Sequence, residues 1–157
     1  MKMIKHSAGL LLYRLKDGVK EFFLVHPGGP FWAKKDAGAW SIPKGEFTEE
    51  DPLDAAKREF EEETGMHLKI DGGKPTPLTP VVLKSGKTVY AWAVEGDMDA
   101  ALIKSNMFEM EWPPKSGKMM SVPEVDKAGW FAGAEAKQRI NPAQAAFIDE
   151  TERLINP

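Results

Sequence analysis

Three glutamates in an acidic stretch are the residues whose type and spacing most clearly suggest chemistry. Glu59, Glu62 and Glu63 stand at positions i, i+3 and i+4, so in a helix their carboxylates share one face. Like charges on one face repel, and the negative end of the helix dipole adds to the cost. Mg²⁺ would offset this repulsion, since it binds carboxylate oxygens together with water and phosphate oxygens. The spacing is consistent with a metal site for phosphoanhydride cleavage, and also with an ordinary solvated acidic face.

The glutamates fall on a predicted helix with well-marked ends, from about Pro52 to Thr64. Asp51 is suited to cap the first turn, and proline is suited to the first helical position. Gly65 fits the left-handed position that ends a helix. An apolar stripe beside the carboxylates would bury one side of this helix in the core: Leu53, Ala56 and Phe60.

The loop and helix from Gly45 to Met66, GEFTEEDPLDAAKREFEEETGM, resemble the Nudix box. The core of that box reads arginine, glutamate, apolar, any residue, two glutamates, any residue, glycine, apolar. The chain matches every fixed position of the core: Arg58, Glu59, Phe60, Glu62, Glu63, Gly65 and Met66. Glu50 matches the earlier box glutamate, with seven residues between it and the arginine. The chain departs from the pattern between Gly45 and Glu50, where four residues stand and the box has one more.

The resemblance implies a cofactor and roles for the box residues. The cofactor is Mg²⁺, for which Mn²⁺ can substitute. Glu62 and Glu59 are expected to be catalytic, and Glu62 is the residue whose loss should abolish turnover. The implied metal ligands are three carboxylates and one main-chain carbonyl: Glu59, Glu62, Glu63 and Gly45.

The resemblance also implies supporting residues and a further carboxylate. Arg58 and Glu50 match the pair that braces the loop against the helix and so orients the ligands. Nudix enzymes often take one more glutamate, as metal ligand or general base, from a loop outside the box. Glu109 and Glu111 lie in a long region that we expect to be irregular, and Glu124 precedes the final strand. We favour Glu111 as the third catalytic residue.

The segment from His26 to Ala39 is loop-like, yet it carries aromatic and basic side chains. Phe31 or Trp32 could stack on a base while lysines neutralise phosphates, and the aromatic residues could equally anchor the loop to the core. Lys44, beside the box glycine, could contact a phosphate or be a surface charge. The predicted substrate-binding residues are Lys44, Trp32, Lys34 and Lys35.

Other parts of the chain extend the resemblance. WSIPKG, residues 40–45, is similar to the segment before the box in Nudix proteins that act on dinucleoside polyphosphates or diphosphoinositol compounds. HSAGLLLYR, FEMEWPP and PEVDKAGWF are similar to segments of bacterial Nudix proteins described as predicted NTP pyrophosphohydrolases. The resemblance implies a hydrolase that cleaves a phosphoanhydride bond in a nucleoside diphosphate-linked substrate, with a dinucleoside polyphosphate as the expected class. The alternative is a catalytically silent Nudix-fold nucleotide-binding or sensor module, which the intact box glutamates disfavour.

The remaining elements follow from apolar patterning. Strands are expected at 7–13, 21–25, 40–43, 68–70, 81–84, 88–94 and around Trp130. A last helix is expected at 142–155, capped by Asn141, with one apolar face formed by Phe147, Ile148, Leu154 and Ile155. The stretch 105–123 contains three prolines and is expected to be irregular. With the resemblance, the expected fold class is α/β, the Nudix fold, an α/β/α sandwich with a mixed sheet.

Bulk properties limit the function classes. With 157 residues, 42% of them hydrophobic, residues 1–157 are expected to form a single Nudix hydrolase domain. The 21 basic and 24 acidic residues are mixed, giving a net charge of -3 that argues against a nucleic-acid duplex as partner. The absence of cysteine excludes disulfides and thiolate sites. No apolar run is long enough for a membrane span, so we expect a cytoplasmic monomer or homodimer that acts on a small phosphoanhydride substrate.

Overall fold

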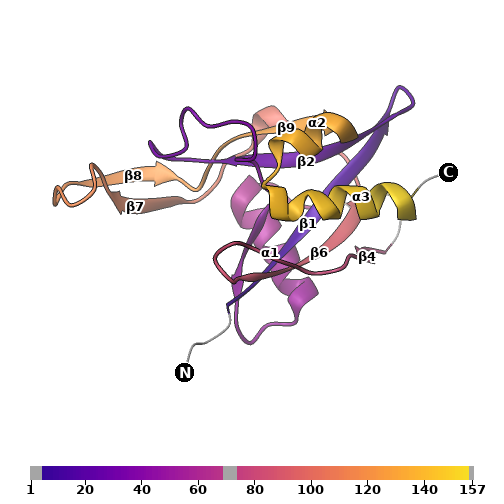
Figure 1. The fold of residues 1–157 in the computed structure, drawn as a ribbon, viewed down its shortest axis with the longest axis horizontal. Coiled ribbons are helices and arrows are strands. Elements are labelled where there is room, and N and C mark those ends of the chain that lie inside the picture. The colour runs from indigo at the N-terminus through magenta and orange to yellow at the C-terminus, as the bar shows by residue number, and fades with distance from the viewer. Residues whose placement is uncertain (1–4, 69–73, 156–157) are drawn as a thin grey trace.

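The computed structural model, which describes residues 5–68 and 74–155, is a mixed β-sheet with helices on both faces (Figure 1). The strands are β1 (His6–Lys16), β2 (Val19–Pro27), β3 (Lys44–Phe47), β4 (Thr76–Pro77), β5 (Val81–Val82), β6 (Thr88–Glu95), β7 (Met107–Glu111), β8 (Met119–Pro123) and β9 (Val125–Ala132). The α-helices are α1 (Pro52–Thr64), α2 (Gly133–Arg139) and α3 (Ala145–Leu154). Short 3₁₀ turns span Ala100–Leu102 and Pro142–Gln144.

β1 is the centre of the main sheet, whose strand order is β4-β6-β1-β2-β9. It runs parallel to β6 over residues 6–13 and antiparallel to β3 over residues 6–9. Its second half pairs antiparallel with β2, which in turn pairs with β9. β3 therefore lies against the start of β1, and this pairing fixes Lys44 and Gly45 in the sheet, one loop ahead of α1.

Two apolar clusters fill the spaces on the two sides of this sheet. Successive side chains of a strand point to opposite faces, so Leu10 and Leu12 join the cluster under α1 while Leu11 joins the other. The first cluster includes Phe60 of α1, and the second includes Phe147 of α3. Figure 1 shows α1 behind the sheet and α2 and α3 in front of it. This arrangement confirms the predicted α/β/α sandwich.

The ends of α1 are the ones that the sequence predicts. The Asp51 carboxylate accepts a hydrogen bond from the Asp54 amide, and proline occupies the first turn. Gly65 is left-handed, with φ of 69°, and its amide donates to the Glu61 carbonyl. The helix is therefore fixed at both ends, and its buried side includes Ala56, Phe60 and Glu63.

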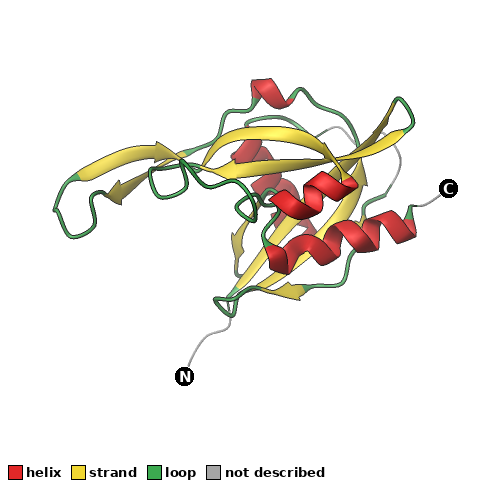
Figure 2. Cartoon of the chain, turned by 45° about the horizontal axis from the view of Figure 1, so that its top comes forward, coloured by secondary structure: helices red, strands yellow, loops and turns green. Residues whose placement is uncertain are grey.

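Four expectations were wrong. Residues 105–123 contain a β-hairpin, β7–β8, which projects from the body of the molecule (Figure 2). Residues 40–43 make only isolated bridges, through Trp40 and Ser41, because the chain crosses between β2 and α2 there. The C-terminal helix is preceded by the unpredicted α2 and by a 3₁₀ turn capped by Asn141. Its Leu154 is exposed, so only part of its predicted apolar face is buried.

The remaining predictions about strands and domains are confirmed in part or stay predictions. Most of the expected strand 68–70 lies outside the described residues. The expected strand 81–84 is shorter, since only Val81 and Val82 pair with β6. Within residues 5–68 and 74–155, none of the helices has the length and apolar character needed to cross a membrane. That residues 1–157 form one domain stays a prediction.

Candidate active site

Glu59 and Glu63 of α1 lie against β3, and the three box glutamates differ in exposure. Glu63 is buried, Glu59 is largely buried, and the Glu62 side chain is 42% exposed. Glu63 Oε2 accepts a hydrogen bond of 3.1 Å from the Lys44 amide of β3. The helix face predicted from the i, i+3, i+4 spacing is thus formed, with Glu63 turned toward the sheet and Glu62 toward solvent.

Arg58 binds the loop before the helix and the glutamates beside it. Its Nε lies 2.9 Å from Glu50 Oε2, and its Nη1 lies 2.8 Å from Glu59 and 3.2 Å from Glu62. These carboxylates raise the pKa of Arg58, and the arginine in turn lowers the pKa of Glu50. The structure therefore places Arg58 and Glu50 together in the bracing geometry that the resemblance implies.

Gly45 lies directly against the Glu59 carboxylate. A β-carbon built at this position would overlap the carboxylate oxygens, so only glycine allows the approach. Gly45 pairs with Ala8 of β1, which fixes its position in the sheet. The shorter loop between Gly45 and Glu50 therefore still brings the glycine main chain beside a predicted metal ligand.

Glu63 and Lys44 occupy a poorly solvated corner of the site. Burial raises the pKa of Glu63 to about 8, against the opposing effect of the Lys44 amide and ammonium. Burial, followed by repulsion from Lys87, lowers the pKa of Lys44. The pKa of Glu59 is also raised, mainly by burial, while Arg58 opposes the shift. A site with these shifts disfavours the ionised carboxylates unless a cation neutralises them.

A cavity of about 220 Å³ adjoins these groups. Its charged lining residues are Lys44, Glu63 and Glu124. Its apolar and aromatic lining is Val25, Pro27, Trp32, Ala39, Trp40, Leu83 and Val125, and its neutral polar lining is Ser41, Asn141 and Gln144. One cavity therefore combines the box helix, a lysine, two tryptophans and polar side chains from the C-terminal part.

The structure places Glu124, rather than the favoured Glu111, beside the box glutamates. Glu124 lines the cavity, and its charge raises the pKa of both Glu59 and Glu63. The Glu111 carboxylate instead accepts hydrogen bonds from the Lys115 and Gly117 amides at the tip of the β7–β8 hairpin. The preference for Glu111 over Glu124 therefore finds no support in the structure, because Glu111 holds its own turn.

Glu109 is also on the hairpin, in β7, where it lies opposite Ser121.

The sequence contained one signal for Glu124, which is the position of this residue in the chain. It directly precedes β9, which pairs with β2, and its carbonyl accepts from the Gly28 amide at the end of β2. This position is informative only once the pairing of β9 with β2 is known. The cavity positions of Trp40, Leu83, Asn141 and Gln144 also depend on long-range contacts, and the sequence did not predict them.

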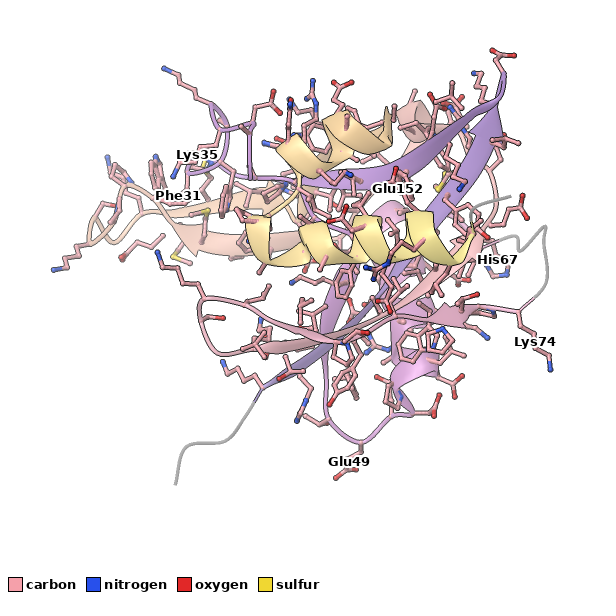
Figure 3. All side chains as sticks on the ribbon, turned by 45° about the vertical axis from the view of Figure 1, so that its right-hand side comes forward. Phe31, Lys35, Glu49, His67, Lys74 and Glu152 are labelled. Atoms are coloured by element: carbon pink, nitrogen blue, oxygen red, sulfur yellow. The ribbon has the colours of Figure 1, made fainter. Side chains whose placement is uncertain are left out.

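The predicted substrate-binding residues of the loop after β2 separate into two groups. Trp32 lines the cavity and packs against the core, so it fits both readings of the aromatic pair. Phe31 is exposed, and the Lys35 ammonium lies 3.8 Å from its ring centre. Figure 3 shows Phe31 and Lys35 together at the margin of the molecule. Lys34 is exposed on the same loop. Of this group, the structure brings Trp32 to the cavity together with Lys44.

The donor chemistry of the site fits a hard divalent cation. In the part of the chain that the structure describes, no three His, Cys, Asp or Glu side chains are arranged as a ready metal cage. The reason is visible in the contacts: Arg58 takes Glu59 and Glu62, while Glu63 is bonded to the Lys44 amide. The three box glutamates offer carboxylate oxygens, which are ligands that Mg²⁺ prefers. Two of them, Glu59 and Glu63, have raised pKa values.

Comparison with known proteins places this site in a family. The family model described as the NUDIX domain matches residues 4–151. The chain belongs to the NUDIX family. By this membership it is a Nudix pyrophosphohydrolase. No curated protein matches the Nudix chain significantly.

Solved structures share the Nudix fold at low sequence identity. A binary complex of the C. elegans Ap4A hydrolase has a TM-score of 0.65 at 19% identity, over 95% of this chain and 97% of that one. The NUDIX domain of Shewanella oneidensis NrtR, complexed with ADP ribose, has a TM-score of 0.66 at 15% identity, over 100% and 91%. A MutT protein from Methanosarcina mazei has a TM-score of 0.62 at 18% identity, over 99% and 98%. At these identities the likeness shows the fold.

Proposed function

We propose that this Nudix protein hydrolyses a phosphoanhydride bond in a nucleoside diphosphate-linked substrate, with Mg²⁺ held by its box glutamates and Mn²⁺ able to replace it. The observation that carries the proposal is that Lys44, Glu63 and Glu124 line one cavity, and that the charge of Glu59 acts on the buried Glu63. Buried acids with raised pKa values beside a cavity are typical of functional sites. The proposal includes the predicted cytoplasmic location.

Each part of the chain contributes a definite step. Glu59, Glu62, Glu63 and the Gly45 carbonyl would hold the cation, which when bound neutralises charge on the phosphate oxygens. Arg58 keeps Glu59 and Glu62 on one side of the helix through its bonds to both.

The groups that line the cavity act on the substrate and on water. Lys44 Nζ is available to pair with a phosphate oxygen that the cation leaves uncovered. Glu124, which lines the cavity, and Glu62 of α1, whose side chain is 42% exposed, have carboxylate oxygens that can take the proton of an attacking water.

The test of this proposal is hydrolysis with and without metal. The purified protein is incubated with dinucleoside polyphosphates, nucleoside triphosphates, nucleotide sugars and inositol pyrophosphates in Mg²⁺, and then in excess chelator. We expect turnover of at least one class in Mg²⁺, recovery with Mn²⁺, and loss of turnover in chelator. Full turnover in chelator contradicts the metal assignment. Tight nucleotide binding without turnover would instead identify the sensor module that the sequence left as the alternative.

The finer proposal is a dinucleoside polyphosphate with four or more phosphates. Its support is the combination of an aromatic wall, made by Trp32 and Trp40, with Lys44 in the same cavity. A base can stack on such a wall while the phosphates extend toward the lysine and the glutamates. We expect kcat/KM to be higher for this substrate than for a nucleoside triphosphate. Equal kcat/KM for the two contradicts the substrate class and leaves the reaction type intact.

A further inference from the structure

His26, at the end of β2, is a buried histidine for which the reaction described above has no use. Its side chain is 1% exposed. The ring Nδ1 lies 2.8 Å from Asp126 Oδ1 on β9, and the ring Nε2 lies 2.6 Å from the Lys35 carbonyl oxygen. Both distances are within hydrogen-bond range. The ring therefore connects the sheet to the loop that follows β2.

The identity of these two partners determines the protonation of the ring. A carbonyl oxygen and a carboxylate oxygen both accept hydrogen bonds and cannot donate them. Each ring nitrogen must then carry a hydrogen, and a ring with two N–H groups is an imidazolium. A neutral histidine would lose one of the two bonds and leave one acceptor oxygen facing a nitrogen lone pair.

Hydrogen bonds of the Lys35 peptide connect His26 to the loop residue that lines the cavity. Its carbonyl accepts from the ring, and its amide donates to the Trp32 carbonyl over 2.9 Å. The Trp32 amide donates in turn to the Gly29 carbonyl, which closes the turn. Trp32 is the residue of this loop whose side chain lines the cavity. The His26 ring therefore helps to fix the position of Trp32 in the cavity wall through the Lys35 peptide.

The charged groups near His26 hold the other end of the same loop. Asp36 accepts from Trp40 Nε1 over 2.6 Å and pairs with Arg139 of α2 at 2.9 Å. The Trp40 ring meets the His26 ring edge to face at 5.2 Å, and Lys127 of β9 lies 5.6 Å from the Trp40 ring centre. The carboxylate that faces the imidazole directly is that of Asp126.

We propose that His26 is a positioning residue, held as an imidazolium between Asp126 and the Lys35 carbonyl, that fixes Trp32 for substrate binding. This inference rests on the proposed function for its kinetic consequence and on hydrogen-bond geometry for the charge state. It assigns to a buried group outside the box a specific effect on KM.

The kinetic test uses variants that remove or keep the two bonds. His26→Gln cannot reach both acceptors, so we expect KM to rise about fivefold or more while kcat stays within about twofold. In Asp126→Asn the amide can donate to Nδ1, so a neutral ring keeps its bond to Lys35 and KM should stay near the wild-type value. His67→Gln is the matched control, because its side chain is 91% exposed. A fall in kcat with unchanged KM in His26→Gln overturns the positioning role.

The charge-state test needs no substrate. Long-range ¹H–¹⁵N spectra of the ¹⁵N-labelled protein at pH 7 report both ring nitrogens, and the His26 signals are those missing in His26→Gln. We expect two similar shifts of the protonated kind in the wild type, and two well-separated shifts of a neutral ring in Asp126→Asn. A neutral wild-type ring overturns the imidazolium. If the ring is doubly protonated but no phosphoanhydride is cleaved, the proposed function fails and the charge state holds.

One further variant covers the case in which His26→Gln does not fold. Asp126→Ala removes one acceptor, and the side chain that it replaces is 33% exposed, so little packing is lost. We expect a neutral ring in its spectrum and an increase in KM smaller than that of His26→Gln. An unchanged doubly protonated ring in Asp126→Ala contradicts the proposal.

Discussion

The β3–α1 segment and the β7–β8 hairpin both carry neighbouring glutamates, and they use them in opposite ways. In β3–α1, Glu63 is buried with a raised pKa and Glu59 lies against Gly45. In the hairpin, the Glu111 carboxylate accepts from two amides of its own turn. Carboxylates of the first kind are poorly solvated, and burial raises their pKa, while the Glu111 carboxylate is satisfied by two backbone amides. The hydrogen-bond partners and burial of a glutamate, more than its place in the sequence, therefore decide whether it is a candidate for function.

The two segments also differ in their support. α1 packs on the sheet through Ala55, Ala56 and Phe60, which are fully buried. The hairpin has exposed Met107, Met119 and Met120, and its two strands form a separate small sheet. A side chain on α1 is therefore held more firmly than one on the hairpin tip. Catalytic groups need such support to keep their geometry.

The strongest test of this contrast is Glu62→Gln. The change keeps the shape of the side chain and removes the charge that, in the proposed function, binds a cation or takes a proton. We expect kcat to fall by about a hundredfold or more. The side chain is 42% exposed, so thermal unfolding should change little. Activity within a few-fold of wild type, with the same unfolding temperature, would show that another glutamate has this role.

A second test compares the two glutamates outside the box. Glu124 lines the cavity and acts electrostatically on Glu59 and Glu63, so Glu124→Gln should lower kcat by about tenfold or more. Glu111→Gln is the matched change on the hairpin, where it should leave kcat within about twofold. The measurement is kcat for both variants at saturating Mg²⁺. The reverse ranking would restore Glu111, the residue that the sequence favoured.

A third test compares the aromatic neighbours of the loop. Trp32 lines the cavity, so Trp32→Ala should raise KM several-fold through loss of stacking, with a smaller change in kcat. Phe31 is 51% exposed, and the Lys35 ammonium lies over one face of its ring. Phe31→Ala should therefore leave KM nearly unchanged. KM and kcat are measured for both variants on the preferred substrate. Equal effects on KM would show that the exposed ring also contacts substrate.

The sequence predicted the parts of the site that depend on local order. Helix α1 begins and ends at the predicted residues because Asp51, Pro52 and Gly65 act within one turn of the helix. The Arg58–Glu50 contact and the shared face of Glu59 and Glu63 follow from the same short spacings. Local rules were sufficient there because each contact joins residues of one loop and helix.

Long-range contacts explain what the sequence did not predict. Glu124 reaches the cavity because β9 pairs with β2, and Gln144 reaches it because its amide oxygen accepts from the Ile42 amide. The β7–β8 hairpin was hidden by the prolines at its tip and by the lack of a regular apolar alternation along it. The sandwich itself was predictable from its strands, whereas the wall of the cavity depended on their order.

The smallest expected effect concerns the stability of the metal-free protein. The ordinary carboxyl pKa of 4.5 applies to Glu63 in the unfolded chain, and burial raises it to about 8 in the folded one. Between these values the folded state binds more protons, so the free energy of unfolding falls as pH rises. The raised pKa of Glu59 acts in the same direction, whereas the lowered pKa of Lys44 acts in the opposite direction, because the folded state then binds fewer protons than the unfolded chain.

In excess chelator, we therefore expect the Tm of the wild type to fall between pH 5 and pH 8, the window set by the shift of Glu63. Glu63→Gln removes this titration and should give a flatter profile, with a higher Tm than wild type at pH 8. Saturating Mg²⁺ should also flatten the wild-type profile, because a bound cation favours the ionised carboxylate. The Glu49→Gln variant is a control for the loss of one negative charge, since Glu49 lies in the loop before the helix and its side chain is exposed. A wild-type Tm that stays level or rises over this range in chelator would show that Glu63 ionises without penalty, and that the contrast with the satisfied Glu111 is smaller than its burial implies.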